Sequence, residues 1–111
     1  MQEIRLKSSI RVAAEIKRCE AEFIPAMVLH KGDEERGQII IKQYVHGMGA
    51  RIYSETRDMD DKLIWHEPLG EGYMEEQKAD DYIVRQKSFD EDLWVIEIDD
   101  PKEKYVVGII E

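Results

Sequence analysis

The close spacing of four strand-like segments between residues 26 and 66 constrains the fold more than any other feature. Only short polar or glycine-containing turns such as "KGDEERG" and "HGMG" separate them. A connection between parallel strands needs a crossover of a dozen or more residues, which these turns cannot supply. Most of the sheet is therefore expected to be antiparallel. The segments fall at residues 26–30, 38–45, 50–54 and 63–66.

Two segments show helical rather than strand-like patterns. Ahead of the first strand, apolar residues recur at spacings of three and four, which predicts one buried helix face. This helix is expected to begin at Ser8 or Ser9 and to end before Pro25, because a proline disfavours helix at the residue before it. Residues 73–87 are rich in Glu, Gln, Lys and Ala and predict a second helix with a thin apolar stripe.

A fifth strand is expected at residues 93–98, and residues 105–110 are a candidate sixth. Alternation along the fifth strand places Trp94 and Ile96 on one face, which we interpret as the core face. Glu97 lies on the other face, where solvent is expected. The 111 residues are enough for one domain. We therefore predict a single α+β domain over residues 1–111, with a mostly antiparallel sheet of five or six strands and both helices packed on one face.

Charge is distributed unevenly along the chain. Residues 1–54 hold nine Lys/Arg and seven Asp/Glu, whereas residues 55–111 hold seven and eighteen. An acidic half repels phosphate groups, so nucleic acid is disfavoured as a partner, and a protein partner or self-association is expected instead. Nucleic-acid binding stays a third hypothesis through the basic residues of the first half: Arg5, Lys7, Arg11, Lys17, Arg18, Lys31, Arg36, Lys42 and Arg51.

Apolar runs in the chain are short. Runs such as Ile39–Ile41 and Leu93–Ile96 are far below the ~20 residues that a membrane-spanning helix needs. Residues 1–9 carry charges and lack the apolar centre of a signal peptide. The single cysteine, Cys19, cannot form an internal disulfide, which fits a reducing compartment. We expect a cytoplasmic protein that does not enter a membrane.

Several segments together resemble a known family. They are "LKSSIRVAAEIKRCEAE", "GDEERGQIIIK", "ARIY" and "ADDYIVRQKSFDEDLWVIEIDD", and they span nearly the whole chain. The chain is similar to the alphaproteobacterial family called domain of unknown function 1491. The resemblance implies a small cytoplasmic bacterial protein and carries over no catalytic residue. Its most specific positions are Tyr82, Arg85, Phe89, Asp90, Asp92, Leu93, Trp94 and Glu97.

Acidic residues cluster between Asp90 and Asp100, around the fifth strand. Carboxylates can bind a hard cation, but this stretch lacks the central glycine and regular spacing of a calcium loop. The structural alternative is a helix-to-strand junction in which aspartates accept backbone N–H groups. We therefore predict no metal ligand and no catalytic residue. The candidate binding residues are Arg85, Asp90, Asp92, Trp94 and Glu97.

The remaining reactive residues show no catalytic or metal-binding pattern. His30, His46 and His66 are far apart in the sequence and lack the close-spaced pair typical of zinc sites. Cys19 lies on the apolar helix stripe, which favours a buried and unreactive thiol. No cofactor is expected, because neither a phosphate-binding glycine pattern nor a nucleophile motif is present.

The leading interpretation is a non-catalytic protein-interaction or accessory domain. Its contact surface is expected at a sheet edge or at a bare sheet face. The alternative is an enzyme or a ligand- or metal-binding domain whose site combines Arg85, Asp90, Asp92 and Glu97 with one histidine. Whether the chain is an enzyme is left open, because such a site depends on geometry rather than on sequence order.

Overall fold

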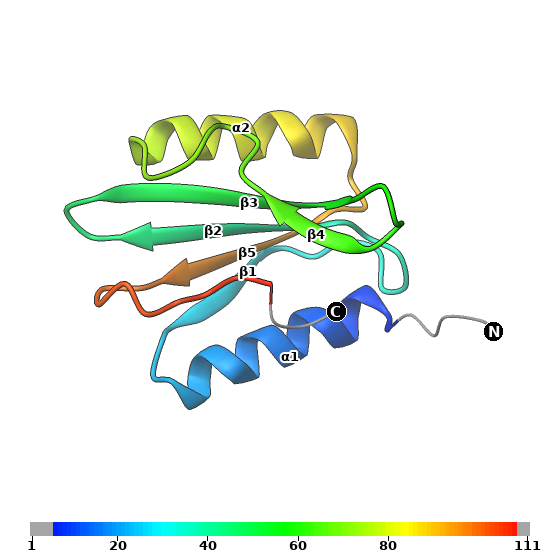
Figure 1. Ribbon diagram of the computed structural model, residues 1–111, viewed down its shortest axis with the longest axis horizontal. Coiled ribbons are helices and arrows are strands. Elements are labelled where there is room, and N and C mark those ends of the chain that lie inside the picture. The colour runs from blue at the N-terminus through cyan, green and yellow to red at the C-terminus, as the bar shows by residue number, and fades with distance from the viewer. Residues whose placement is uncertain (1–5, 109–111) are drawn as a thin grey trace.

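A five-stranded sheet with the order β1-β5-β2-β3-β4 forms the centre of the molecule in the computed structural model, which describes residues 6–108 (Figure 1). One helix precedes the strands in sequence and the other precedes the last strand. The elements are α1 (Ser8–Ala21), β1 (Ala26–His30), β2 (Ile39–Val45), β3 (Gly49–Arg57), β4 (Leu63–His66), α2 (Glu76–Phe89) and β5 (Trp94–Asp99).

Three of the four strand pairs are antiparallel, which confirms the predicted sheet type. These pairs are β1 with β5, β2 with β3, and β3 with β4. The exception is the central pair of β2 and β5, which run parallel, with Lys42 opposite Glu97. The long connection through β3, β4 and α2 permits this, because parallel neighbours need a crossover.

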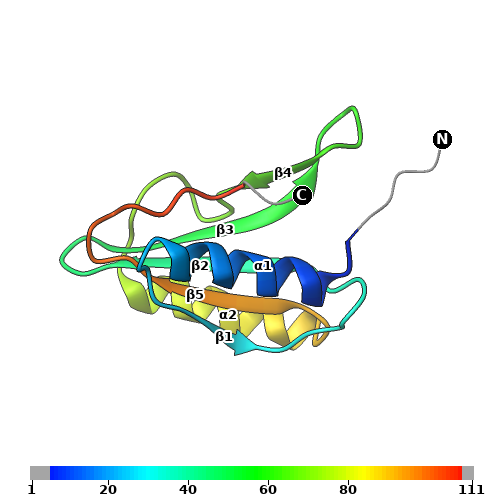
Figure 2. The same ribbon diagram turned by 90° about the horizontal axis from the view of Figure 1, so that it is seen from below.

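The two helices lie on opposite faces of the sheet, so the predicted packing on one face is wrong. On one face, Val12 and Cys19 of α1 pack with Ile39 and Ile41. On the other face, Ala79 and Ile83 of α2 pack with apolar residues that alternate with these along the same strands. Figure 2 shows α1 and α2 on either side of the strands. The reason lies in the three consecutive isoleucines of β2, which bury side chains on both faces and therefore need a cover on each.

The candidate sixth strand does not form within the described residues. Residues 104–108 are irregular and cross the α1 face, and the rest of that candidate lies outside the described residues. The Asp100 carboxylate fixes this segment, because it accepts hydrogen bonds from the N–H of Lys104 (2.9 Å) and Tyr105 (2.8 Å) and from Gln43 Nε2 (2.9 Å). The Tyr105 side chain is buried in the core between the sheet and α1.

The start of α2 is later than predicted because the residues before it pair with the sheet. Met74 and Ala50 exchange two backbone hydrogen bonds of 2.9 Å, which hold the chain extended there. The helix can begin only once the chain leaves this pairing, at Glu76.

Candidate functional site

A turn at Gly32 and Asp33 clamps the junction between α2 and β5. The Asp33 N–H donates to the Asp92 carbonyl at 2.9 Å, and the Asp33 carbonyl accepts from Trp94 Nε1 at 2.7 Å. A Cβ atom at Gly32 would stand 2.1 Å from the Asp92 oxygen, so only glycine allows this close approach. The Ser8 hydroxyl also donates to the Gly37 carbonyl at 2.6 Å, which ties the start of α1 to the same turn.

Four of the five candidate binding residues lie at this junction or on the helix before it. Asp90 follows α2, and its carboxylate accepts the Asp92 N–H at 3.0 Å. Trp94 is buried in the α1-side core, where its face was predicted to lie. Arg85 is exposed on α2. Glu97 is the exception, since it lies near the other end of β5. The five side chains therefore do not form one site.

Glu97 belongs instead to a cluster around Lys42, which the sequence reasoning did not identify as a site residue. Lys42 Nζ lies 2.7 Å from a carboxylate oxygen of Glu76 and of Asp80, and 3.0 Å from one of Glu97. The lysine is only 3% exposed, whereas its partners keep contact with water. The sequence contains one indication of this cluster, the lysine at the centre of the apolar strand "IIIKQYV". A buried charge requires partners, so this lysine predicts acidic residues nearby.

Lys42 stays charged at neutral pH despite its burial. Burial alone would lower the pKa of this lysine, but the hydrogen bonds to Asp80, Glu76 and Glu97 outweigh it and raise the pKa above its ordinary value of 10.5. A lysine that acts as a base or forms a Schiff base needs a lowered pKa. The Lys42 cluster therefore holds three carboxylates together around a charged ammonium group.

Two of these carboxylates also line an open groove of about 430 Å³ at the start of β1. We call it the acidic groove. Its wall combines acids from both helices and from β5 with apolar residues of β1, and its volume is within the ~300–1,000 Å³ of typical ligand sites. The lining residues are Glu20, Pro25, Ala26, Met27, Tyr44, Glu76, Glu97 and Asp99.

The strand beside the groove, β1, is an edge strand with exposed apolar side chains. Among the described residues it pairs only with β5, and Figure 2 shows it at the edge of the sheet. Three consecutive apolar residues are exposed here: Met27 at 57%, Val28 at 39% and Leu29 at 44%. The neighbouring Phe23 is also exposed. Apolar groups on an unpaired strand edge are a typical contact surface for another chain.

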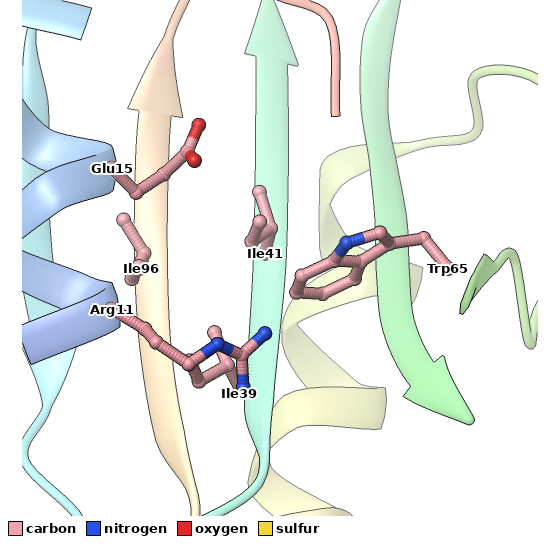
Figure 3. A pocket seen from close by; sticks show the side chains of 6 residues that line it. All are labelled: Arg11, Glu15, Ile39, Ile41, Trp65 and Ile96. Carbon is pink, nitrogen blue, oxygen red and sulfur yellow. The ribbon is translucent and has the colours of Figure 1, made fainter. Parts of the chain in front are cut away.

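A second pocket lies beneath α1, but it is too small for a metabolite. Figure 3 shows Arg11 and Glu15 of α1 on one side and the Trp65 ring on the other. Its volume is about 10 Å³, room for roughly one water molecule. Arg11 forms an ion pair of 2.7 Å with Glu55. The pocket lining consists of Arg11, Glu15, Ile39, Ile41, Trp65 and Ile96.

The histidines and the cysteine show no catalytic arrangement. Across residues 6–108 no group of three His, Cys, Asp or Glu side chains is placed to hold a metal ion. His30 Nδ1 lies 2.7 Å from the Leu93 carbonyl, a contact that belongs to the junction. Cys19 is buried as predicted, and burial raises the pKa of its thiol to about 11, which makes it a poor nucleophile at neutral pH. No helix of the described chain is long and apolar enough to cross a membrane.

The fold and groove define a small α+β domain with a helix on each face of a mixed sheet. The chain belongs to the family described as "Protein of unknown function (DUF1491)", whose profile matches residues 6–107. This confirms the resemblance inferred from the sequence. No curated protein matches the chain.

Solved structures from alphaproteobacteria share this fold. A crystal structure of a DUF1491 family protein from Caulobacter crescentus is 34% identical, with a TM-score of 0.80, and the match covers 86% of this chain and 89% of that one. An NMR structure of a family protein from the same organism is 33% identical, with a TM-score of 0.79 and 90% coverage of each chain. A solution structure of a protein from A. tumefaciens is 27% identical, with a TM-score of 0.76, covering 96% of this chain and 93% of that one.

Proposed function

We propose that this chain is a protein-interaction domain that binds an extended segment of another protein along the free edge of β1. The observation that carries the proposal is an edge strand with three consecutive exposed apolar residues beside an open groove. Strand addition combines main-chain hydrogen bonds, which supply affinity, with side-chain contacts, which supply specificity.

The hydrogen-bond pattern of β1 leaves backbone groups for such a partner. Asp99 N–H donates to the Pro25 carbonyl at 2.9 Å, and Met27 is opposite Glu97 in the same ladder. In an antiparallel ladder the residues between hydrogen-bonded pairs direct their N–H and C=O groups to the other side. Ala26 and Val28 therefore offer two donors and two acceptors to the open edge.

The length of the open edge sets the length of the bound segment. Pro25 has no N–H and stands at the start of the strand, and a bulge between Val28 and His30 interrupts the pairing with β5 at its end. Regular strand geometry is thus limited to Ala26–Val28. The proposed partner contributes a short extended segment rather than a long strand.

Nucleic-acid binding has less support, because several basic residues of the first half are paired within the chain. Arg11 pairs with Glu55, Arg18 with Glu15, and Lys42 with three carboxylates. Arg51 makes two hydrogen bonds of 2.8 and 2.9 Å with the Glu67 carboxylate. Phosphate binding would require these cations to release their partners.

A proline at the edge tests the proposal directly. Val28→Pro removes one outward N–H without breaking the ladder to β5, whereas the control Val28→Thr keeps that donor. The probes are labelled peptides of alternating threonine and valine with lysine-arginine, glutamine-glutamine or glutamate-glutamate at the centre. We expect at least one to bind the wild type and the Val28→Thr variant, measured by fluorescence anisotropy, and to bind Val28→Pro more weakly.

Amide exchange supplies an independent measurement on the same edge. In the free protein, the amides of Ala26 and Val28 should exchange with solvent faster than that of Met27. A bound peptide should then protect Ala26 and Val28. Peptide binding that leaves these two amides unprotected and is equally strong for Val28→Pro would contradict strand addition at β1.

A further inference from the structure

We infer that the segment bound at β1 is cationic, with adjacent lysine or arginine side chains that enter the acidic groove from the two faces of the sheet. The inference rests on the proposed function and adds the chemistry of the partner. It follows from the position of the groove, its charge and the direction of strand side chains.

The acidic groove and the free edge are one continuous surface. Three residues at the start of the edge strand, Pro25, Ala26 and Met27, themselves line the groove. A segment that pairs with Ala26 and Val28 would therefore lie beside the groove, within reach of long side chains. Its side chains at this point would contact the groove lining rather than open solvent.

Within residues 6–108, every charged residue of the groove lining is acidic. Lys42 is buried and already shared by three carboxylates, two of which belong to the lining. No ion pair involves Glu20 or Asp99 within residues 6–108, and both are exposed. The four lining acids are Glu20, Glu76, Glu97 and Asp99.

The acids lie on both sides of the edge strand. Glu20 extends from α1, which covers the face of Trp94 and Ile96. Glu97 and Asp99 alternate with those residues along β5 and so belong to the α2 face, where Glu76 begins α2. Neighbouring side chains of an added strand point to opposite faces. Two adjacent basic residues would therefore each meet an acid, one on either face.

The uncharged lining also suits lysine and arginine. Met27 can pack against the aliphatic stem of either side chain, and the Tyr44 ring can receive a cationic head on its face. Lys42 holds Glu76 and Glu97 in place before binding, which lowers the ordering cost of the complex. A second copy of this chain fits less well, because its own β1, Ala26–His30, contains no lysine or arginine.

The three peptides distinguish charge recognition from strand pairing. We expect the lysine-arginine peptide to bind the wild type more tightly than the glutamine-glutamine peptide, by roughly fivefold, and the glutamate-glutamate peptide to bind weakest. Added salt should weaken binding of the lysine-arginine peptide only. Equal affinity for all three, lost in Val28→Pro, would overturn the inference and leave the proposed function standing.

Matched charge variants locate the effect. The groove variant Glu20→Gln/Asp99→Asn and the control Glu22→Gln/Glu91→Gln remove two exposed carboxylates each, so both change net charge equally. Only the groove variant should bind the lysine-arginine peptide more weakly than the wild type, by roughly fivefold. Equal weakening in both would show a general charge effect and overturn the inference.

Two further measurements test the alternative ligands of this surface, a small cation and a second copy of the chain. Free spermidine or arginine that binds as tightly as the lysine-arginine peptide would overturn the inference in favour of a small cation. A dimer in sedimentation that Val28→Pro dissociates would overturn it in favour of a second copy. Weak spermidine binding and a monomeric protein, together with the peptide preference, support it.

Discussion

The two ends of β5 carry acidic residues that serve different purposes. At the amino end, Asp90 and the nearby Asp33 accept hydrogen bonds from backbone N–H groups and fix the junction. At the carboxyl end, Glu97 and Asp99 line an open groove, whereas the adjacent Asp100 is buried and accepts backbone N–H groups. Backbone donors within reach satisfy the first pair. In the second pair, Glu97 contacts Lys42 at 3.0 Å, whereas Asp99 forms no ion pair within residues 6–108. A cluster of acidic residues therefore does not by itself indicate a binding site. Structural acids differ from groove acids in having backbone N–H donors within hydrogen-bond distance.

The largest effect is expected at the amino end, from Trp94→Ala. The side chain is buried and its Nε1 donates to the Asp33 carbonyl, so the variant should lose about 3–5 kcal/mol of unfolding free energy. Urea denaturation followed by circular dichroism measures the loss. A loss below about 1 kcal/mol, the usual net value of one hydrogen bond, would show that the junction does not depend on this residue.

At the carboxyl end, Lys42→Met should lower the free energy of unfolding by about 2 kcal/mol. This is less than the ~3–5 kcal/mol expected for a fully buried ion pair, because the carboxylate partners of Lys42 are partly exposed. The folded-state pKa of Lys42 is raised above 10.5, so its contribution is complete below that pH and is lost as pH rises through the raised value. The stability gap between wild type and variant should therefore stay constant up to that pH and narrow above it. A gap that widens at alkaline pH would contradict this.

A smaller loss is expected at the junction turn from Asp33→Ala. The variant leaves the N–H groups of Glu35 and Arg36 without their carboxylate acceptor, at a cost of about 1 kcal/mol, because both lie near solvent. Asp33→Asn keeps an acceptor oxygen and serves as the control in thermal unfolding. Equal losses in the two variants would mean that the charge, rather than the hydrogen bonds, stabilises the turn.

The smallest change in stability is expected for Asp99→Asn. This exposed side chain lies next to other carboxylates, so neutralising it should leave unfolding free energy within about 0.5 kcal/mol of wild type. The same change should still weaken binding of the lysine-arginine peptide, measured by fluorescence anisotropy. A clear loss of stability would place Asp99 with the structural acids of the amino end and remove the contrast between the two ends.

The elements of the fold could be predicted from sequence because their patterns are local. The glycine turn between β2 and β3, the stripe of α1 and the Trp94 face of β5 all depend on neighbouring residues. The predicted placement of both helices on one face was wrong, because it would leave the apolar side chains of the other sheet face uncovered. The apolar runs at Ile39–Ile41 and Leu93–Ile96 indicate strands buried on both faces, a pattern that requires a helix on each side.

The candidate site could be predicted only in part, because its residues come from five elements. Glu97 was identified, but as a member of a cluster with Arg85, Asp90 and Asp92 that the fold does not assemble. Glu20 and Glu76 are unremarkable in sequence, and only packing brings them to the start of β1. Their convergence depends on long-range pairing, which no local spacing encodes.

The strand order also determines when the binding edge comes into existence. Within residues 6–108, the last strand in sequence, β5, inserts between the first two, and β1 pairs with β5 alone. During synthesis β1 therefore has no strand to pair with until β5 has left the ribosome. Contacts between such distant segments also slow folding. A chain that lacks β5 offers β1 no strand to pair with, so the proposed partner would bind only after β5 has folded into the sheet.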